Sequence, residues 1–174
     1  LLTRLQALVL RERQVAERNP QTQFVGALGD LYRAAGQPRL AREQYELVGA
    51  IDRLYAANGV ATDLELALFN VDHGINLRES LARARRARSE RPSIEADGVL
   101  AWALARNGRC GEALRYSKRA LRLGTLDAPK FFHRGMIERC LGRNAEARRW
   151  FNRALRLNPN FSLVWAPVAR RAVA

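Results

Sequence analysis

Several residue types on which catalysis and metal binding depend are scarce in this sequence. Its 174 residues include two histidines, two cysteines and one methionine. No glycine-rich phosphate loop, serine elbow or pair of acids at a diagnostic spacing is present. No apolar run approaches the roughly 18 residues that suggest a membrane span. These absences argue against an enzyme and against a membrane span, and we expect no catalytic residue, no metal site and no cofactor.

Lysine is also scarce. Of the 30 basic residues, only Lys118 and Lys130 are lysines, and the other 28 are arginines. The formal net charge is +13. Arginine pairs well with carboxylates and phosphates, so an acidic protein, a nucleic acid or an anionic surface could be a partner. The alternative is the compositional bias of a genome rich in G and C, in which case the charge only keeps the surface solvated.

What the sequence does contain is an internal repeat. Segments 100–113 and 134–147 match at a shift of 34 residues, with small residues, a Gly-Arg pair and a Glu-Ala pair coinciding. The repeat is a small residue, glycine seven later, a small residue five beyond, an aromatic or small residue after four, and Ala or Val after three. Three sets of residues follow it and a fourth does so with a one-residue slip: Gly29, Gly36, Ala41, Tyr45 and Val48; Ala101, Gly108, Ala113, Ser117 and Ala120; Gly135, Gly142, Ala147, Phe151 and Ala154; and Ala67, Gly74, Ser80, Ala84 and Ala87.

This spacing predicts one helical hairpin per repeat. Small residues at the point where two helices cross let the axes approach to the short end of the usual range of about 8–10 Å. Pro92 and Pro159 would end second helices, because proline cannot extend the hydrogen-bond ladder. A glycine in the left-handed conformation would end each first helix, at Gly36, Gly74, Gly108 and Gly142.

These residues and spacings resemble the tetratricopeptide repeat (TPR) family. The resemblance implies an all-α fold, a right-handed superhelix of helical hairpins with a C-terminal capping helix. The step from Gly29 to Ala67 is 38 residues rather than 34, which adds about one turn to a helix. We therefore expect one solenoid domain, 1–174, made of the second helix of a truncated repeat (1–21), a repeat with an extended second helix (22–59), three repeats (60–93, 94–127 and 128–161) and a capping helix (162–174).

Details of the two ends and of two repeat positions add to this expectation. Because the chain begins at Leu1 inside a helical pattern with no Met, we expect the natural N-terminus to lie upstream. Glu138 and Asn70 stand where the family usually has a large apolar side chain. The capping helix is expected to bury four side chains: Phe161, Val164, Trp165 and Val168.

The resemblance also implies a function, because the first helices of TPR hairpins line a concave groove that commonly receives an extended peptide or a partner helix. We expect a non-catalytic scaffold that binds a protein or peptide of acidic character. An aromatic and thioether floor beside arginines would suit an apolar segment that carries carboxylates. Alternatively, Trp102, Phe132 and Met136 are core residues, since their spacing fits either role. The groove positions in this chain are Asp30, Arg33, Trp102, Arg106, Phe132, His133, Met136 and Arg139.

A second candidate surface is a stripe of arginines on the second helices. Arginines at i, i+4 and i+7 recur 34 residues later, and this spacing puts them on one outward face. Such a convex stripe could bind nucleic acid or another polyanion, although no aromatic residues interleave with it in the sequence. A third alternative is a self-association module of a larger protein. The stripe consists of Arg85, Arg88, Arg115, Arg119, Arg122, Arg149, Arg153 and Arg156.

The two cysteines, Cys110 and Cys140, fall near the hairpin tips of consecutive repeats and could be close in space. A disulfide between them would close a loop of about 30 residues and favour an extracytoplasmic location. The alternative is two free thiols in a reduced cytoplasm. A zinc site that uses both cysteines and His133 has no recognised ligand spacing. The sequence therefore leaves the localisation open.

Overall fold

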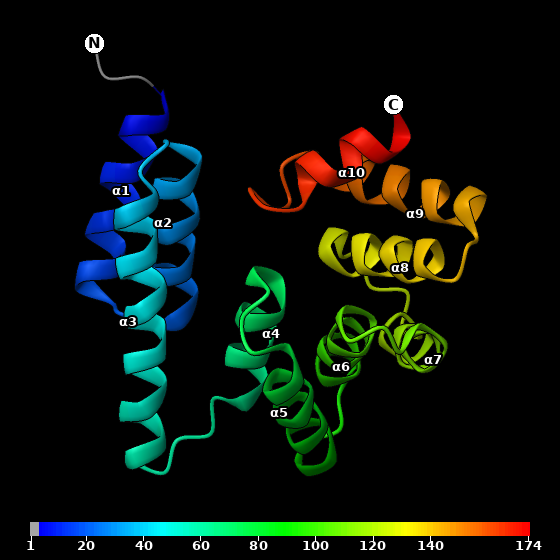
Figure 1. The fold of residues 1–174 in the computed structure, drawn as a ribbon, viewed down its shortest axis with the longest axis horizontal. Helices are drawn as coiled ribbons and strands as arrows, with labels where there is room; N and C mark the ends of the chain where they lie inside the picture. Colours follow the sequence, from blue (N-terminus) through cyan, green and yellow to red (C-terminus); the bar gives the residue numbers. More distant parts are fainter. Residues whose placement is uncertain (1–3) are drawn as a thin grey trace. The chain divides into compact units, whose positions relative to one another are not determined.

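The computed structural model describes residues 4–174, which form ten α-helices and no strand (Figure 1). The expected all-α class built of helical hairpins is confirmed. The first three residues of the predicted truncated repeat, 1–21, lie outside the described residues. The helices are α1 (Arg4–Arg18), α2 (Thr22–Ala34), α3 (Pro38–Ala57), α4 (Asp63–His73), α5 (Leu77–Glu90), α6 (Ile94–Arg106), α7 (Cys110–Ala120), α8 (Ala128–Cys140), α9 (Asn144–Leu157) and α10 (Ala166–Val173).

The chain forms two compact units, and the division falls inside α4. Unit 1 is Leu1–Phe69 and unit 2 is Asn70–Ala174. In unit 1, α2 packs against both α1 and α3. In unit 2, α5 packs on α6, α7 on α8, and α9 on α10. The predicted organisation as a single solenoid domain stays a prediction.

Glycines end the first helices of the hairpins, as the repeat predicts. Gly36, Gly74, Gly108 and Gly142 have φ angles of 72°, 73°, 75° and 74°. This left-handed conformation strains a residue that has a Cβ atom. After the glycine, the chain reverses and starts the second helix, so α2 packs on α3, α6 on α7 and α8 on α9.

The length of α3 agrees with the longer spacing in its repeat. The helix has 20 residues, whereas α5, α7 and α9 have 14, 11 and 14. Val48 and Ile51 of α3 are buried. Beyond the buried part, Leu54 is exposed, so the last turns of α3 extend past the core of unit 1.

The C-terminal helix begins later than expected. The prediction had it start near residue 162, but α10 starts at Ala166. Ser162 Oγ accepts hydrogen bonds from the N–H groups of Val164 and Trp165, at 3.2 and 3.1 Å, which holds this stretch in a turn. Pro167 lies in the first turn of α10, where its missing N–H costs nothing. Four side chains expected to be buried are only half-buried: Phe161, Val164, Trp165 and Val168.

Among residues 4–174, no helix combines the length and the apolar character that crossing a membrane requires.

Candidate protein-binding site

A carboxylate at the end of α4 joins two tryptophans in unit 2. Asp72 Oδ1 accepts a hydrogen bond from Trp102 Nε1 of α6 at 2.8 Å. The same oxygen accepts one from Trp165 Nε1, just before α10, at 2.9 Å. Hydrogen bonds to an ionised acceptor are roughly twice as strong as neutral ones. The Asp72 carboxylate therefore ties the C-terminal segment to α4 and α6.

The guanidinium group of Arg106 covers the two indole rings. Its Cζ atom lies 5.4 Å from the ring centroid of Trp102 and 5.1 Å from that of Trp165. Arg106 also donates a hydrogen bond to the carbonyl oxygen of Val71 at 2.7 Å. Burial lowers the pKa of Arg106, and the charge of Asp72 opposes this shift. Cation and aromatic faces attract each other most strongly when they are partly shielded from water, as here.

The imidazole ring of His133 is a neutral member of this cluster. It stacks on Trp102, with ring centroids 4.4 Å apart and an interplanar angle of 10°. Burial lowers the pKa of His133 to about 3, and the positive charges of Arg106 and Lys130 lower it further. His133 Nε2 lies 3.9 Å from Asp72 Oδ1. At neutral pH the pair is not an ion pair, because the imidazole is uncharged.

The aromatic rings continue around Phe132 of α8, which is completely buried at 0% exposure. Its ring centroid lies 6.2 Å from that of Trp102, 5.5 Å from Trp165 and 5.4 Å from Phe161. It also packs against Phe151 of α9 at 5.6 Å. Phe132 therefore links the hairpin of α8 and α9 to the C-terminal segment.

Three of the predicted groove residues are thus covered by the chain itself. Trp102 is 1% exposed, Phe132 is fully buried and His133 is 9% exposed. For Trp102 and Phe132, the structure agrees with the alternative in which they belong to the core. Phe161 and Trp165 cover the face on which a partner was expected. Sequence reasoning missed Asp72, because its position is not one of those at which the repeats share a residue type.

The predicted groove residues are also divided between the two units. Asp30 and Arg33 belong to unit 1, where Tyr45 Oη donates a hydrogen bond to Asp30 Oδ1 at 2.7 Å. Burial and this hydrogen bond raise the pKa of Tyr45. Arg33 is exposed. The role of these residues in partner binding stays a prediction.

Arg139, at the other end of the predicted set, lies beside a hollow of about 560 Å³ in unit 2. Met136, one turn earlier in α8, is half-buried, whereas Arg139 is exposed. Arg139 and Arg148 both line the hollow, and neither forms an ion pair in the part of the chain that the structure describes. The hollow is lined by Arg139, Asn144, Ala145, Ala147, Arg148, Phe151 and Ala172.

The predicted convex arginines are exposed except for Arg88, which is half-buried. Several of them bind groups of the chain itself. Arg88 Nε and Arg122 Nη1 each lie 3.2 Å from the buried carboxylate of Asp97. Arg149 pairs with Glu146 at 2.7 Å. Carboxylates of the chain itself therefore neutralise part of the positive charge of the predicted stripe.

Aromatic residues do lie among these arginines, which corrects the expectation that none interleaves with the stripe. The guanidinium groups of Arg88 and Arg119 lie 5.9 and 5.5 Å from the ring centroid of Tyr116. Arg153 lies 4.7 Å from the ring centroid of Trp150. Arg88 and Tyr116 come from different hairpins, so the sequence pattern could not pair them. The other two contacts are i,i+3 pairs within α7 and α9, which the spacing already contained. Both rings are half-buried.

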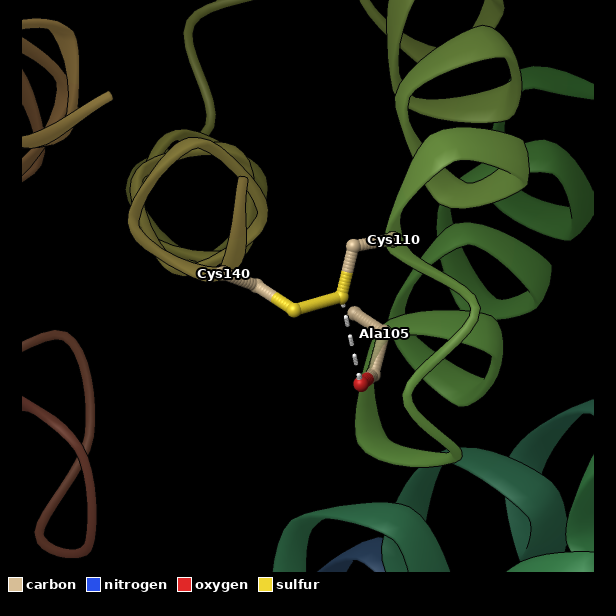
Figure 2. The surroundings of a disulfide bond; sticks show 3 residues. All are labelled: Ala105, Cys110 and Cys140. Carbon is tan, nitrogen blue, oxygen red and sulfur yellow. Dashed lines mark hydrogen bonds between the residues drawn. A yellow bond between two sulfur atoms is a disulfide. The ribbon is translucent and has the colours of Figure 1, made fainter. Parts of the chain in front are cut away.

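The two cysteines form a disulfide in the structure. Figure 2 shows the bond between Cys110, at the start of α7, and Cys140, at the end of α8. Their Cα atoms are 6.1 Å apart, within the range for a disulfide. The Ala105 carbonyl oxygen lies 3.9 Å from Cys110 Sγ. Cys110 is buried and Cys140 is exposed.

The donor groups in the described part of the chain offer no obvious metal site. No group of three or more His, Cys, Asp or Glu side chains suited to a metal ion occurs among residues 4–174. The sulfur atoms considered for a zinc site with His133 are instead bonded to each other.

Comparison with known proteins supports the interpretation of the repeat. Residues 128–161, which contain α8 and α9, match the family model of the tetratricopeptide repeat. A search of curated protein sequences finds no match to the chain.

Proposed function

We propose that this tetratricopeptide repeat protein is a scaffold that binds an acidic segment of a partner protein beside Arg139. Repeats of this family generally mediate protein–protein interactions, and the family is typically a non-catalytic interaction module. The proposal that the partner segment is acidic and binds beside Arg139 rests on the hollow next to Arg139 and Arg148. Arg139 and Arg148 are exposed there, whereas Trp102 and Phe132 of the predicted groove are buried.

The chemistry of the hollow fits an acidic ligand. Two exposed guanidinium groups without an ion-pair partner flank it, and guanidinium groups bind carboxylates through paired hydrogen bonds. The N-terminal residues of α9, Asn144 and Ala145, also line it. No side chain caps this helix end, and the dipole of a helix attracts negative charge to its N-terminus.

Part of the lining of the hollow is apolar. Ala147 and Phe151 of α9, which are buried, and Ala172 of α10 line it. A segment with one apolar side chain between or beside carboxylates could place the apolar group against these residues and the carboxylates beside Arg139 and Arg148. Interfaces commonly combine an apolar anchor with charged groups at the rim.

The aromatic middle of the predicted groove is a weaker candidate for this role. Trp102 and Phe132 are covered by Trp165 and Phe161. The convex arginines are also weaker candidates, because Asp97 and Glu146 already neutralise some of them. Binding of nucleic acid through that stripe is the alternative outcome of the experiment below.

The test is a panel of short labelled peptides that contain acidic residues around one apolar residue, with matched peptides in which Asn and Gln replace Asp and Glu. Binding is measured by fluorescence anisotropy. Arg139→Glu with Arg148→Glu is expected to weaken acidic-peptide binding by about tenfold or more, since each hydrogen bond to a charged group contributes about 1.5–3 kcal/mol.

The matched control is Arg115→Glu with Arg156→Glu, which makes the same charge change at exposed positions of the convex stripe. This control is expected to change the affinity only slightly, through long-range charge that salt screens. Equal losses in both double variants would contradict a site at the hollow. Salt-sensitive binding of single-stranded DNA that only the control variant loses, without binding of acidic peptides, would favour the polyanion alternative.

A further inference from the structure

The side chain of Trp165 lies in a site formed by three helices of unit 2. Asp72 of α4 accepts its N–H at 2.9 Å. The Trp102 ring of α6 meets it edge to face, with centroids 5.5 Å apart and an interplanar angle of 83°. The Phe132 ring of α8 lies 5.5 Å away, and Arg106 lies over its face at 5.1 Å. An acceptor, a cation and two aromatic rings thus match the donor, the π-face and the apolar edges of an indole.

The site does not depend on Trp165 for its own arrangement. Trp102 Nε1 holds the same Asp72 oxygen at 2.8 Å. Arg106 donates a hydrogen bond to the Val71 carbonyl oxygen at 2.7 Å, and His133 stacks on Trp102. None of these contacts involves Trp165, so we expect the acceptor and the cation to stay in position when the Trp165 side chain is removed.

The occupant of this site is a connecting segment and not a helix. It runs from Asn158, after α9, to Trp165, before α10. Phe161 adds a second aromatic contact, with its ring 5.4 Å from Phe132. The segment therefore holds its two aromatic side chains in a turn rather than in a helix.

We infer that unit 2 contains a tryptophan-binding site, formed by Asp72, Trp102, Arg106 and Phe132, which the chain's own Trp165 occupies. Its ligand class is a non-helical segment that carries a tryptophan. A tethered segment competes at an effective concentration of about millimolar order. A tryptophan-bearing segment of a second molecule therefore gains access when Trp165 is released. This site is separate from the hollow beside Arg139.

The test uses the full chain with Trp165→Ala and a labelled peptide that copies residues 158–166. The variant is expected to bind this peptide, and the unchanged chain is expected not to bind it at the same concentrations. A second peptide carries 1-methyltryptophan, which keeps the ring but cannot donate a hydrogen bond to Asp72. It is expected to bind about tenfold more weakly or worse.

Circular dichroism first establishes that the variant keeps its helices. If Trp165→Ala does not fold, Trp165→Phe replaces it, because this variant keeps a ring in the site and loses only the N–H donor. The same peptide is then expected to bind, with lower affinity. Binding of acidic peptides beside Arg139 should be unchanged in either variant, so failure of this inference is distinct from failure of the proposed function.

Two results would overturn the inference. One is a folded variant that binds neither the peptide nor free indole, measured as a rise in its melting temperature with indole. The other is equal affinity for the tryptophan and 1-methyltryptophan peptides, which would mean that the site takes any large aromatic group.

Discussion

The ring of Phe151 packs directly on Gly135, so that the two helices α8 and α9 touch at this point. A Cβ atom added at Gly135 would lie 2.6 Å from Cδ1 and Cε1 of Phe151. Both Gly135 and Phe151 are positions of the repeat pattern. Gly135→Ala is therefore expected to destabilise unit 2 by about 1–3 kcal/mol, the usual cost of overpacking a core.

Urea unfolding followed by tryptophan fluorescence measures this effect, since Trp102, Trp150 and Trp165 all lie in unit 2. Gly111→Ala is the matched control, because a Cβ atom there meets no other group. Alanine is the better helix former by up to about 1 kcal/mol, so the control should be neutral or slightly stabilising. A Gly135→Ala variant as stable as this control would contradict the packing argument.

Features that recur with the repeat could be predicted from the sequence. The helix-ending glycines and the small residues at helix crossings act through local geometry. Because they recur every 34 residues, they can be recognised in the sequence. Asp72 and Trp165 could not be paired in this way. They are 93 residues apart. The repeat position of Asp72 carries Arg106 in the next hairpin, so the carboxylate itself does not recur, and only the folded chain brings Asp72 and Trp165 together.

Glu138 illustrates the same limit on a shorter scale. Its position in the repeat favours an apolar side chain, and it is indeed buried, at 3% exposure. Arg134 lies 2.8 Å from its carboxylate, and Arg143, just before α9, lies 3.3 Å away. The burial follows from the repeat, and the Arg134 pair follows from i,i+4 spacing within α8. The Arg143 pair crosses the turn between α8 and α9, and no helical spacing rule predicts it.

The disulfide between Cys110 and Cys140 should stabilise unit 2. The two residues are 30 positions apart, and a loop of that length corresponds to about 3–4 kcal/mol in the chain-entropy model. Cys110→Ala with Cys140→Ala is expected to lower the free energy of unfolding by this amount. Dithiothreitol should lower the stability of the unchanged chain to the same level and leave the double variant unaffected.

Mass spectrometry provides an independent check on the disulfide. The denatured, unreduced protein should take up no alkyl groups from iodoacetamide, because both thiols are bonded. Uptake of two groups would show free cysteines and remove the basis for the stability prediction.

Asp97 should matter more to stability than any one exposed ion pair. It is 4% exposed and binds Arg88 of α5 and Arg122 after α7, so it joins neighbouring hairpins. Asp97→Ala is expected to cost about 1–3 kcal/mol, because it removes charge-assisted hydrogen bonds. Arg149→Ala, which breaks the exposed pair with Glu146, should cost less than about 1 kcal/mol. Equal effects of the two substitutions, measured by urea unfolding, would contradict the role of Asp97.

His133 should make the stability of unit 2 depend on pH. Its pKa is about 3 in the folded chain because of burial and the nearby charges of Arg106 and Lys130, and about 6.5 when unfolded. Between these values the unfolded state binds more protons, so the free energy of unfolding falls as the pH falls below 6.5, by up to about 1.4 kcal/mol per unit. Above pH 6.5 the imidazole is neutral in both the folded and the unfolded state, so its contribution to the free energy of unfolding is constant.

His133→Phe cannot be protonated and keeps a ring beside Trp102. Between pH 7.5 and pH 5 the unchanged chain should therefore lose about 2 kcal/mol more than this variant. Parallel losses in urea unfolding would mean that the imidazole is protonated in the folded state.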